Sequence, residues 1–254
     1  MGAADVMIEL FAGLVTLAAT SVLTIAGVGA AFILIPIYMS MGIELHTAMS
    51  TALLLNCIAM IFASINFARE RLILWRTAFP ILISATILSL LGSYSSQYFP
   101  RNTLLILFVI FLAFAASMML FYKPKPKEKQ NSGGKEIVIG IGVGSIAGFV
   151  GGLLGVGGGN IIVPALVWLG IEPKKASATT AFVVIFSSFS GFLGRASLGH
   201  LDVHLLLFTA VGAILGAILG SWLLSKKLNN RQIKIAIGVI LYFIALKMAY
   251  DLLF

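Results

Sequence analysis

Charged residues are scarce in this chain: 10% of its 254 residues are charged, whereas 60% are hydrophobic. Soluble domains carry roughly 25% charged residues, so the composition excludes a water-soluble domain. Apolar runs such as residues 72–91 and 205–224 are as long as the ~20 residues that a helix needs to cross a bilayer. A membrane β-barrel would instead show short segments of alternating hydrophobicity. The sequence therefore predicts an all-α polytopic membrane protein.

Several chemical motifs are missing as well, and each absence removes a class of function. The single cysteine, Cys57, cannot form an intramolecular disulfide, and its apolar surroundings indicate a small buried side chain. Neither a Gly-x-Ser-x-Gly motif nor a phosphate-binding loop occurs, so we expect no enzyme activity, no ATP hydrolysis and no cofactor. His200 and His204 are one helical turn apart at a membrane edge, without the glutamate of a metalloprotease motif, so no metal site is expected.

The chain does contain an internal repeat. The segment Gly27-Val-Gly29-Ala-Ala-Phe-Ile-Leu-Ile-Pro36 recurs as a glycine cluster from Gly155 to Pro164, and subtracting 27 from 155 gives an offset of 128. The same offset continues without a gap as far as Tyr122 and Tyr250. Ordered blocks that share proline and glutamate indicate a tandem duplication. The predicted parts are a first membrane repeat at 1–122, a basic linker at 123–136 and a second membrane repeat at 137–254.

Each repeat is predicted to contain one short and four long apolar segments. In the first repeat these are about 7–26, 30–42, 47–66, 72–97 and 103–122, and in the second about 137–154, 160–169, 175–195, 203–225 and 231–253. An α-helix rises 1.5 Å per residue, so the short segments at 30–42 and 160–169 reach only about halfway through the membrane. Each short segment must therefore turn back or form a loop.

The distribution of positive charge decides between these two possibilities. If each short segment returns to its starting side, 14 of the 17 Lys and Arg residues lie on one side, opposite Arg101, Arg195 and Lys247. If the short segments do not return, the division is 10 against 7. The positive-inside rule favours the first arrangement. It predicts two inverted repeats, each a Gly-broken helical hairpin followed by three transmembrane helices.

This arrangement places both termini outside and the basic linker in the cytoplasm of a prokaryotic cell. The net charge of +8 then follows from topology, and it indicates contact with anionic membrane lipid rather than with nucleic acid. The expected location is the cell membrane.

The glycine clusters indicate helices that break near the middle of the membrane, which is typical of secondary transporters. Unwound backbone is tolerated there only when it lines a cavity or is buried in protein. A half-helix that begins at such a break presents free N–H groups and a positive dipole end, which suit an anion. Asn160 stands at the expected N-cap of the second half-helix. We expect the backbone at Gly158 to meet the solute, so that a leucine there stops transport without preventing folding.

Other glycines are spaced four residues apart, which indicates close helix packing rather than a break. These are Gly140, Gly144, Gly148 and Gly152, and also Gly212, Gly216 and Gly220.

The second break carries a motif that resembles a known family. Gly-Val-Gly-Gly-Gly-x-Ile-Ile-Val-Pro-Ala-Leu at 155–166, followed by Ala-x-Ala-Thr-Thr at 176–180, is similar to the TauE/SafE sulfite-exporter family. The resemblance covers essentially the whole chain, and it implies transport of sulfur-containing anions such as sulfite, thiosulfate or organosulfonates. The first repeat departs from the motif, because Gly29-Ala30-Ala31 stands where Gly157-Gly158-Gly159 stands in the second. The second break is therefore the better candidate for substrate contact.

Polar side chains on the helices after the breaks complete the candidate site. Hydroxyls can bond their own helix, but the amide of Asn56 cannot, which makes Asn56 a stronger candidate. Arg195 either draws in anions from outside or snorkels to the interface. All nine acidic residues fall at or near segment ends, so no carboxylate is placed to bind a cation or relay protons. The candidate substrate-binding residues are Gly27, Gly29, Thr51, Asn56, Gly155, Gly157, Gly158, Gly159, Asn160, Thr179 and Thr180.

These observations predict a secondary transporter that binds a small anion between the two breaks. A passive anion channel is the alternative, and saturation of the flux in liposomes would separate a carrier from a channel. The transport direction, the coupling ion and the oligomeric state are left open.

Overall fold

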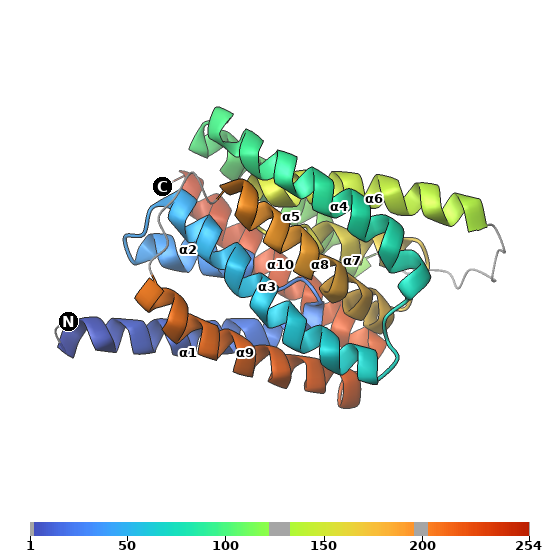
Figure 1. Ribbon diagram of the computed structural model, residues 1–254, viewed down its shortest axis with the longest axis horizontal. Helices are drawn as coiled ribbons and strands as arrows, with labels where there is room; N and C mark the ends of the chain where they lie inside the picture. The colour runs from blue at the N-terminus through green and yellow to red at the C-terminus, as the bar shows by residue number, and fades with distance from the viewer. Residues whose placement is uncertain (1–2, 122–132, 196–202, 254) are drawn as a thin grey trace.

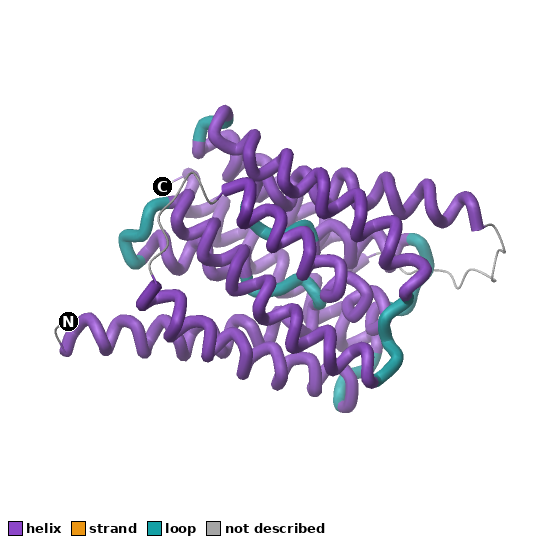
Figure 2. Tube along the Cα trace, in the orientation of Figure 1, coloured by secondary structure: helices purple, strands orange, loops and turns teal. Residues whose placement is uncertain are grey.

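The computed structural model describes residues 3–121, 133–195 and 203–253. The described residues form α-helices and one 3-10 turn, without any strand, so the expectation of an all-α protein is confirmed (Figure 2). The first half contains α1 (Ala3–Ala26), α2 (Ala31–Ser40), α3 (Leu45–Arg69), α4 (Trp75–Ser95), the 3-10 turn η1 (Ser96–Tyr98) and α5 (Arg101–Phe121). The second half contains α6 (Gly133–Leu154), α7 (Gly159–Trp168), α8 (Pro173–Arg195), α9 (Val203–Lys226) and α10 (Asn230–Leu253).

The helix order repeats along the chain. Subtracting the bounds of α2 from those of α7 gives 159 − 31 = 128 at the start and 168 − 40 = 128 at the end. Both short helices carry a proline at their sixth position, Pro36 and Pro164. Most of the predicted linker lies outside the described residues, as does His200.

Helices of each half pack against helices of the other half, so the two halves do not form separate bundles. Helix α1 lies along α9, where a Cβ at Gly216 would be 2.6 Å from Leu17 O and one at Gly220 would overlap Ser21 O. Residue numbers rise together on both helices, so α1 and α9 are parallel. Glycine permits this backbone contact because it has no side chain. The interpretation of the stripe at Gly212, Gly216 and Gly220 as close packing is confirmed.

The same kind of glycine seam joins α6 to α4. A Cβ at Gly144 would be 2.5 Å from Ile81 O, and one at Gly148 would be 2.6 Å from Ala85 Cα. These two helices are also parallel, and the packing role predicted for Gly140, Gly144, Gly148 and Gly152 is confirmed as well.

Helices α3 and α8 form the centre of the protein. Within their most apolar windows, 72% of α3 and 67% of α8 is buried, against 33% for α4 and 39% for α9. The two central helices are antiparallel, because His46 lies near Arg195 and Asn56 near Ser188. Large apolar side chains are exposed on the outer helices, including Ile83, Phe114, Val211 and Phe243. A lipid environment accommodates such a surface.

Figure 1 shows the directions of these helices. Helices α1, α3 and α9 run from left to right in this view, whereas α4, α6 and α8 run from right to left. Helices at equivalent places in the two halves, such as α3 and α8, thus point in opposite directions.

Candidate functional site

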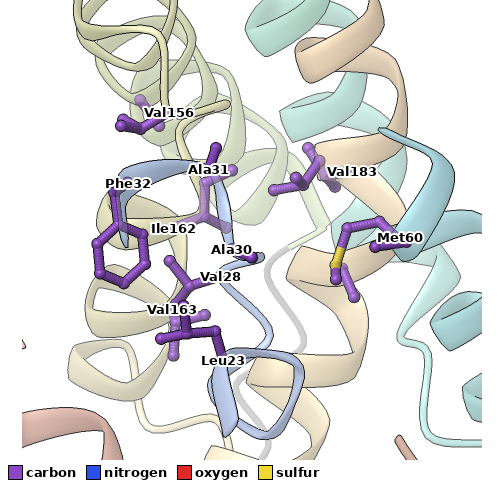
Figure 3. Packing of buried hydrophobic residues seen from close by; sticks show 14 of the residues in the cluster. Leu23, Val28, Ala30, Ala31, Phe32, Met60, Val156, Ile162, Val163 and Val183 are labelled. Carbon is purple, nitrogen blue, oxygen red and sulfur yellow. The ribbon is translucent and has the colours of Figure 1, made fainter. Parts of the chain in front are cut away.

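The two glycine breaks meet in the interior. Gly159, the first residue of α7, lies against the first break, because a Cβ there would be 2.8 Å from Val28 O and 2.9 Å from Val28 Cα. Figure 3 shows Val28 of the first break in one packed cluster with Ile162 and Val163 of α7. All residues from 151 to 160 are buried. The breaks therefore form one buried region, shared by both halves of the chain.

The backbone of the breaks requires glycine at matched places. Gly27 and Gly29 have φ angles of 69° and 78°, and their counterparts Gly155 and Gly157 have 73° and 75°. This left-handed region is disfavoured for residues with a Cβ. The second break differs at Gly158, which has a φ angle of 77°, because its counterpart Ala30 is right-handed with a φ of −87°.

Asn56 on α3 lies between the two breaks. Its Nδ2 donates a hydrogen bond to Ser188 Oγ of α8 at 3.0 Å. A Cβ at Gly29 would overlap Asn56 Oδ1, and a Cβ at Gly157 would lie 3.1 Å from Asn56 Nδ2 and overlap Ser188 Oγ. The structure thus brings three of the predicted residues together, and the missing side chains of Gly29 and Gly157 make room for this amide.

Two serines of α8 belong to the same region, although sequence reasoning left them out of the candidate set. Ser187 Oγ donates to Gly157 O at 2.7 Å, and Ser188 accepts the bond from Asn56. Ser89 Oγ of α4 donates in turn to Ser187 O at 2.7 Å. A signal was present in the sequence, because Thr180, Val184, Ser187 and Ser188 fall on one helical face.

Several buried polar groups in and around the breaks have no hydrogen-bond partner. Both side-chain atoms of Asn160 are unpartnered, and so are Asn56 Oδ1 and the hydroxyls of Thr51 and Thr180. All four side chains are at most 1% exposed. Burying such groups without partners costs about 1–3 kcal/mol each, so native proteins rarely leave them unpaired. This set of groups is suited to binding a polar solute.

Other predicted residues have packing roles. Thr179 Oγ1 accepts the backbone N–H of Leu74 at 3.0 Å, so this hydroxyl stabilises the start of α4. A Cβ at Gly27 would overlap Ser177 O of α8, and a Cβ at Gly155 would lie 2.8 Å from Met49 Cβ of α3. Both glycines therefore allow a helix of the opposite half to approach closely.

The expectation that a leucine at Gly158 would leave folding intact was wrong, whereas contact of the Gly158 backbone with the solute stays a prediction. A Cβ there would point at α6 and lie 2.5 Å from Ala147 O, rather than enter a cavity. Together with the left-handed backbone, this contact means that a leucine at this position would disturb folding itself.

The expectation that Asn160 is an N-cap was also wrong. Gly158 is the N-cap, no side chain caps the helix, and Asn160 is the second residue of α7. Its amide is therefore free of the capping bond that was predicted.

The short helices keep their first N–H groups free, as expected. Ile161 and Ile162 both donate to Gly158 O, and in α2 Ile33 and Leu34 both donate to Ala30 O. The N–H groups of Gly159 and Asn160 precede these bonds, at the positions that an α-helix leaves unpaired. Each short helix thus directs its positive end toward the region where the breaks meet.

Of the two roles considered for Arg195 from the sequence, the structure excludes snorkelling to the interface. It is 0% exposed, so it does not snorkel, and its guanidinium donates to Gly152 O and Leu153 O of α6. The sequence placed it at a helix end but gave no sign that four elements meet there.

Three further observations concern the described residues outside the breaks. Cys57 is a buried free thiol, as predicted. Among the described residues, no group of three or more His, Cys, Asp or Glu side chains could hold a metal ion. A groove of about 500 Å³ lies away from the breaks, between α1 and α9, and apolar residues such as Leu14, Leu17 and Val211 line it.

The described part of the chain contains five helices that are long and apolar enough to cross a membrane. Together with two half-length helices that begin at buried glycine breaks, they define a multi-pass membrane transporter. The chain belongs to the sulfite exporter TauE/SafE family, whose sequence model matches residues 12–248.

Individual relatives agree with this assignment. The chain is 25% identical to the probable membrane transporter protein YunE of Bacillus subtilis, over 94% of this chain and 96% of that protein. It is 26% identical to a probable membrane transporter protein of Methanocaldococcus jannaschii, over 85% of each chain. A 45-residue stretch is 56% identical to sulfite exporter TauE/SafE family protein 3 of Arabidopsis thaliana, covering 18% of this chain and 10% of that protein. No solved structure matches this chain.

Proposed function

We propose that the protein is a secondary transporter of small sulfur-containing anions such as sulfite, thiosulfate or an organosulfonate, and that it binds them between the two glycine breaks. The observation that carries the proposal is the set of buried, unpartnered polar groups on Asn56, Asn160, Thr51 and Thr180. The choice of sulfur oxyanions is supported by the name of the family.

The chemistry of these groups suits an anion. An anion that leaves water must replace its hydration shell, because an unpaired charge in a low-dielectric interior is prohibitively costly. Amide N–H and hydroxyl groups can donate hydrogen bonds to the oxygens of such a ligand. The free N–H groups at the starts of α2 and α7 add further donors.

Transport is proposed to proceed by alternating access of two inverted repeats. The proposal is supported by the opposite directions of equivalent helices, such as α3 and α8 (Figure 1). It is supported further by the contact between the two breaks at Val28 and Gly159, which would place one solute between both halves. Rocking of one half against the other would then expose that place to each side in turn. We propose a location in the cell membrane with both termini outside.

The test is flux in liposomes that contain the purified protein. Uptake of radiolabelled sulfite should saturate with concentration, and unlabelled sulfite inside should speed the exchange, because a carrier returns faster when loaded. Thiosulfate, an organosulfonate and sulfate, each added as a competitor, then define the substrate class. Flux that rises linearly with concentration and ignores the internal anion would instead support a passive channel. Absence of flux and of binding for every anion in the panel would contradict the proposal.

A further inference from the structure

The helix ends at the two breaks do not by themselves select an anion. Helices α2 and α7 begin there, and each contributes about +0.5 elementary charge at its N-terminus. Helices α1 and α6 end at the same breaks, and each contributes about −0.5 at its C-terminus. These four contributions cancel. An additional positive charge is therefore required if the region is to favour an anion over a neutral solute that also forms hydrogen bonds.

Arg195 supplies such a charge at the second break. Its Nη2 donates to Gly152 O at 2.7 Å and to Leu153 O at 3.0 Å, two carbonyls in the last turn of α6 before the break. Its Nη1 donates to Ser96 Oγ at 2.8 Å and lies 3.4 Å from His46 Nδ1. Ser93 Oγ also donates to Gly152 O, at 3.0 Å. The negative end of α6 is thus covered by donors, while the positive end of α7 stays free.

Among the described residues, no acidic side chain forms an ion pair with this arginine. The ion pairs between described residues join Lys175 to Glu172 and Lys226 to Glu70, and neither involves Arg195. Its side chain is completely buried, and its Nε also has no partner. A guanidinium stays protonated in proteins, and a buried charge without a counter-ion costs several kcal/mol. The end of α6 offsets only about half of one charge.

The first break has no equivalent of this arginine. Subtracting the offset, 195 − 128 = 67, places Phe67 at the matching position of α3. The residue at that position therefore places no guanidinium at the C-terminal end of α1. The additional positive charge is present at the second break only.

We infer that Arg195 determines the charge selectivity of the transporter: it supplies the positive charge that the bound anion balances. Arg195 acts by bonding the carbonyls at the end of α6 and through the electrostatic field of its charge. It is therefore a positioning and specificity-determining residue. This inference rests on the proposed function, because it assigns a role at the proposed anion site.

The test compares three substitutions by equilibrium binding of radiolabelled sulfite to purified protein. Arg195→Gln removes the charge and should weaken sulfite binding by about tenfold or more. Arg195→Lys keeps the charge but loses the forked pair of bonds to α6, so its affinity should stay within about threefold of that of the parent protein. The control Ser96→Ala removes a bond to the guanidinium without changing any charge, and its affinity should match that of the parent.

Unfolding temperature separates this role from a purely structural one. Arg195→Gln and Arg195→Lys both lose bonds to Gly152 and Leu153, so both should lower the unfolding temperature, whereas only the glutamine variant should lose sulfite. Equal loss of binding in the two variants, or unchanged binding in Arg195→Gln, would overturn the inference. If the glutamine variant does not fold, Arg195→Met takes its place, and the lysine variant still has to retain binding. Failure of the parent protein to bind any anion of the panel would instead contradict the proposed function.

Discussion

The first and second glycine breaks have the same backbone conformation at two matched glycines but different side chains around them. Gly27 and Gly29 share their left-handed backbone with Gly155 and Gly157, and both short helices have the same length. Around this frame, Ala30, Phe32 and Phe67 of the first half correspond to Gly158, Asn160 and Arg195 of the second. Asn56 reverses the trend, since its counterpart is Val184. The shared backbone makes two breaks that fit each other, while the polar side chains at matched positions differ between the halves.

Such a division follows from how the two breaks meet. Because Val28 and Gly159 are in contact, a polar group from either half reaches the same buried region. One set of donors therefore serves both halves, and the equivalent positions of the other half are free to be apolar and to pack. Differences between matched residues thus separate the residues that the backbone of the breaks requires from the residues that the ligand requires.

The largest effect is expected at the position where the two backbones differ. Gly158→Ala adds a Cβ in a left-handed conformation and 2.5 Å from Ala147 O, which should lower the free energy of unfolding by about 2–4 kcal/mol. Ala30→Gly at the matching right-handed position should change it by less than about 1 kcal/mol. Unfolding of the purified variants in a denaturing-detergent titration measures both. Equal effects of the two substitutions would show that the breaks have the same backbone after all.

A somewhat smaller effect, on binding rather than folding, is expected at Asn160. Asn160→Asp places a like charge beside the ligand, and at about 6 Å and an effective dielectric constant of about 20 this repulsion is roughly a hundredfold in affinity. Asn160→Ser keeps a hydrogen-bonding group and should cost less than about tenfold. Sulfite binding to the purified variants provides the measurement.

The matched control for Asn160 is Phe32→Leu in the other half. Phe32 offers no polar group, so this variant should bind sulfite with an affinity within about threefold of that of the parent. Full affinity in Asn160→Asp would mean that the anion site lies elsewhere.

Asn56 should have an intermediate effect because it belongs to the first half but reaches the second. Asn56→Leu removes an amide of similar volume and should weaken sulfite binding by about tenfold. Ser188→Ala removes only the partner of Asn56 Nδ2, so the amide remains and the loss should be smaller. A larger loss in Ser188→Ala than in Asn56→Leu would assign ligand contact to the serine instead.

The smallest functional effect is expected for substitutions that only report the side on which a residue lies. In a Cys57→Ala background, a cysteine in place of Lys129 or Lys227 should react with an impermeant thiol reagent only from the cytoplasm. A cysteine in place of the exposed Gln97 should react only from outside. Transport by all three should be close to that of the parent. Labelling of position 129 from outside would contradict the inverted arrangement.

The sequence predicted the elements of this fold well because their signals are local. A long apolar run ends where glycines cluster, so α2 and α7 were expected within a few residues of where they lie. The pairing of α1 with α9 and of α4 with α6 was not predictable in the same way. Glycines at four-residue spacing show that one helix face is closely packed, but they do not identify the helix that packs there.

The candidate site was predicted in part, for a related reason. An asparagine at position 56, inside an apolar helix, indicated a role in the site, since a buried amide needs partners from another helix. The roles of Gly158 and Arg195 depend on the direction of a side chain relative to α6, which no spacing along the chain encodes. An arginine at the end of a helix usually reaches water, so only the assembled structure shows it bonded to carbonyls inside the protein.

The parallel glycine seam between α1 and α9 has a consequence for biosynthesis. Gly13 on α1 faces Gly212 on α9, and 212 − 13 = 199 residues separate the two partners along the chain. At a translation rate of about 5–20 residues per second, α1 waits roughly 10–40 s in the membrane before its partner is made. Contacts between such distant segments slow folding, because a long loop must close first. During that interval the face of α1 that later packs on α9 stays unpaired, so it is open to incorrect pairing or to protection by a membrane chaperone.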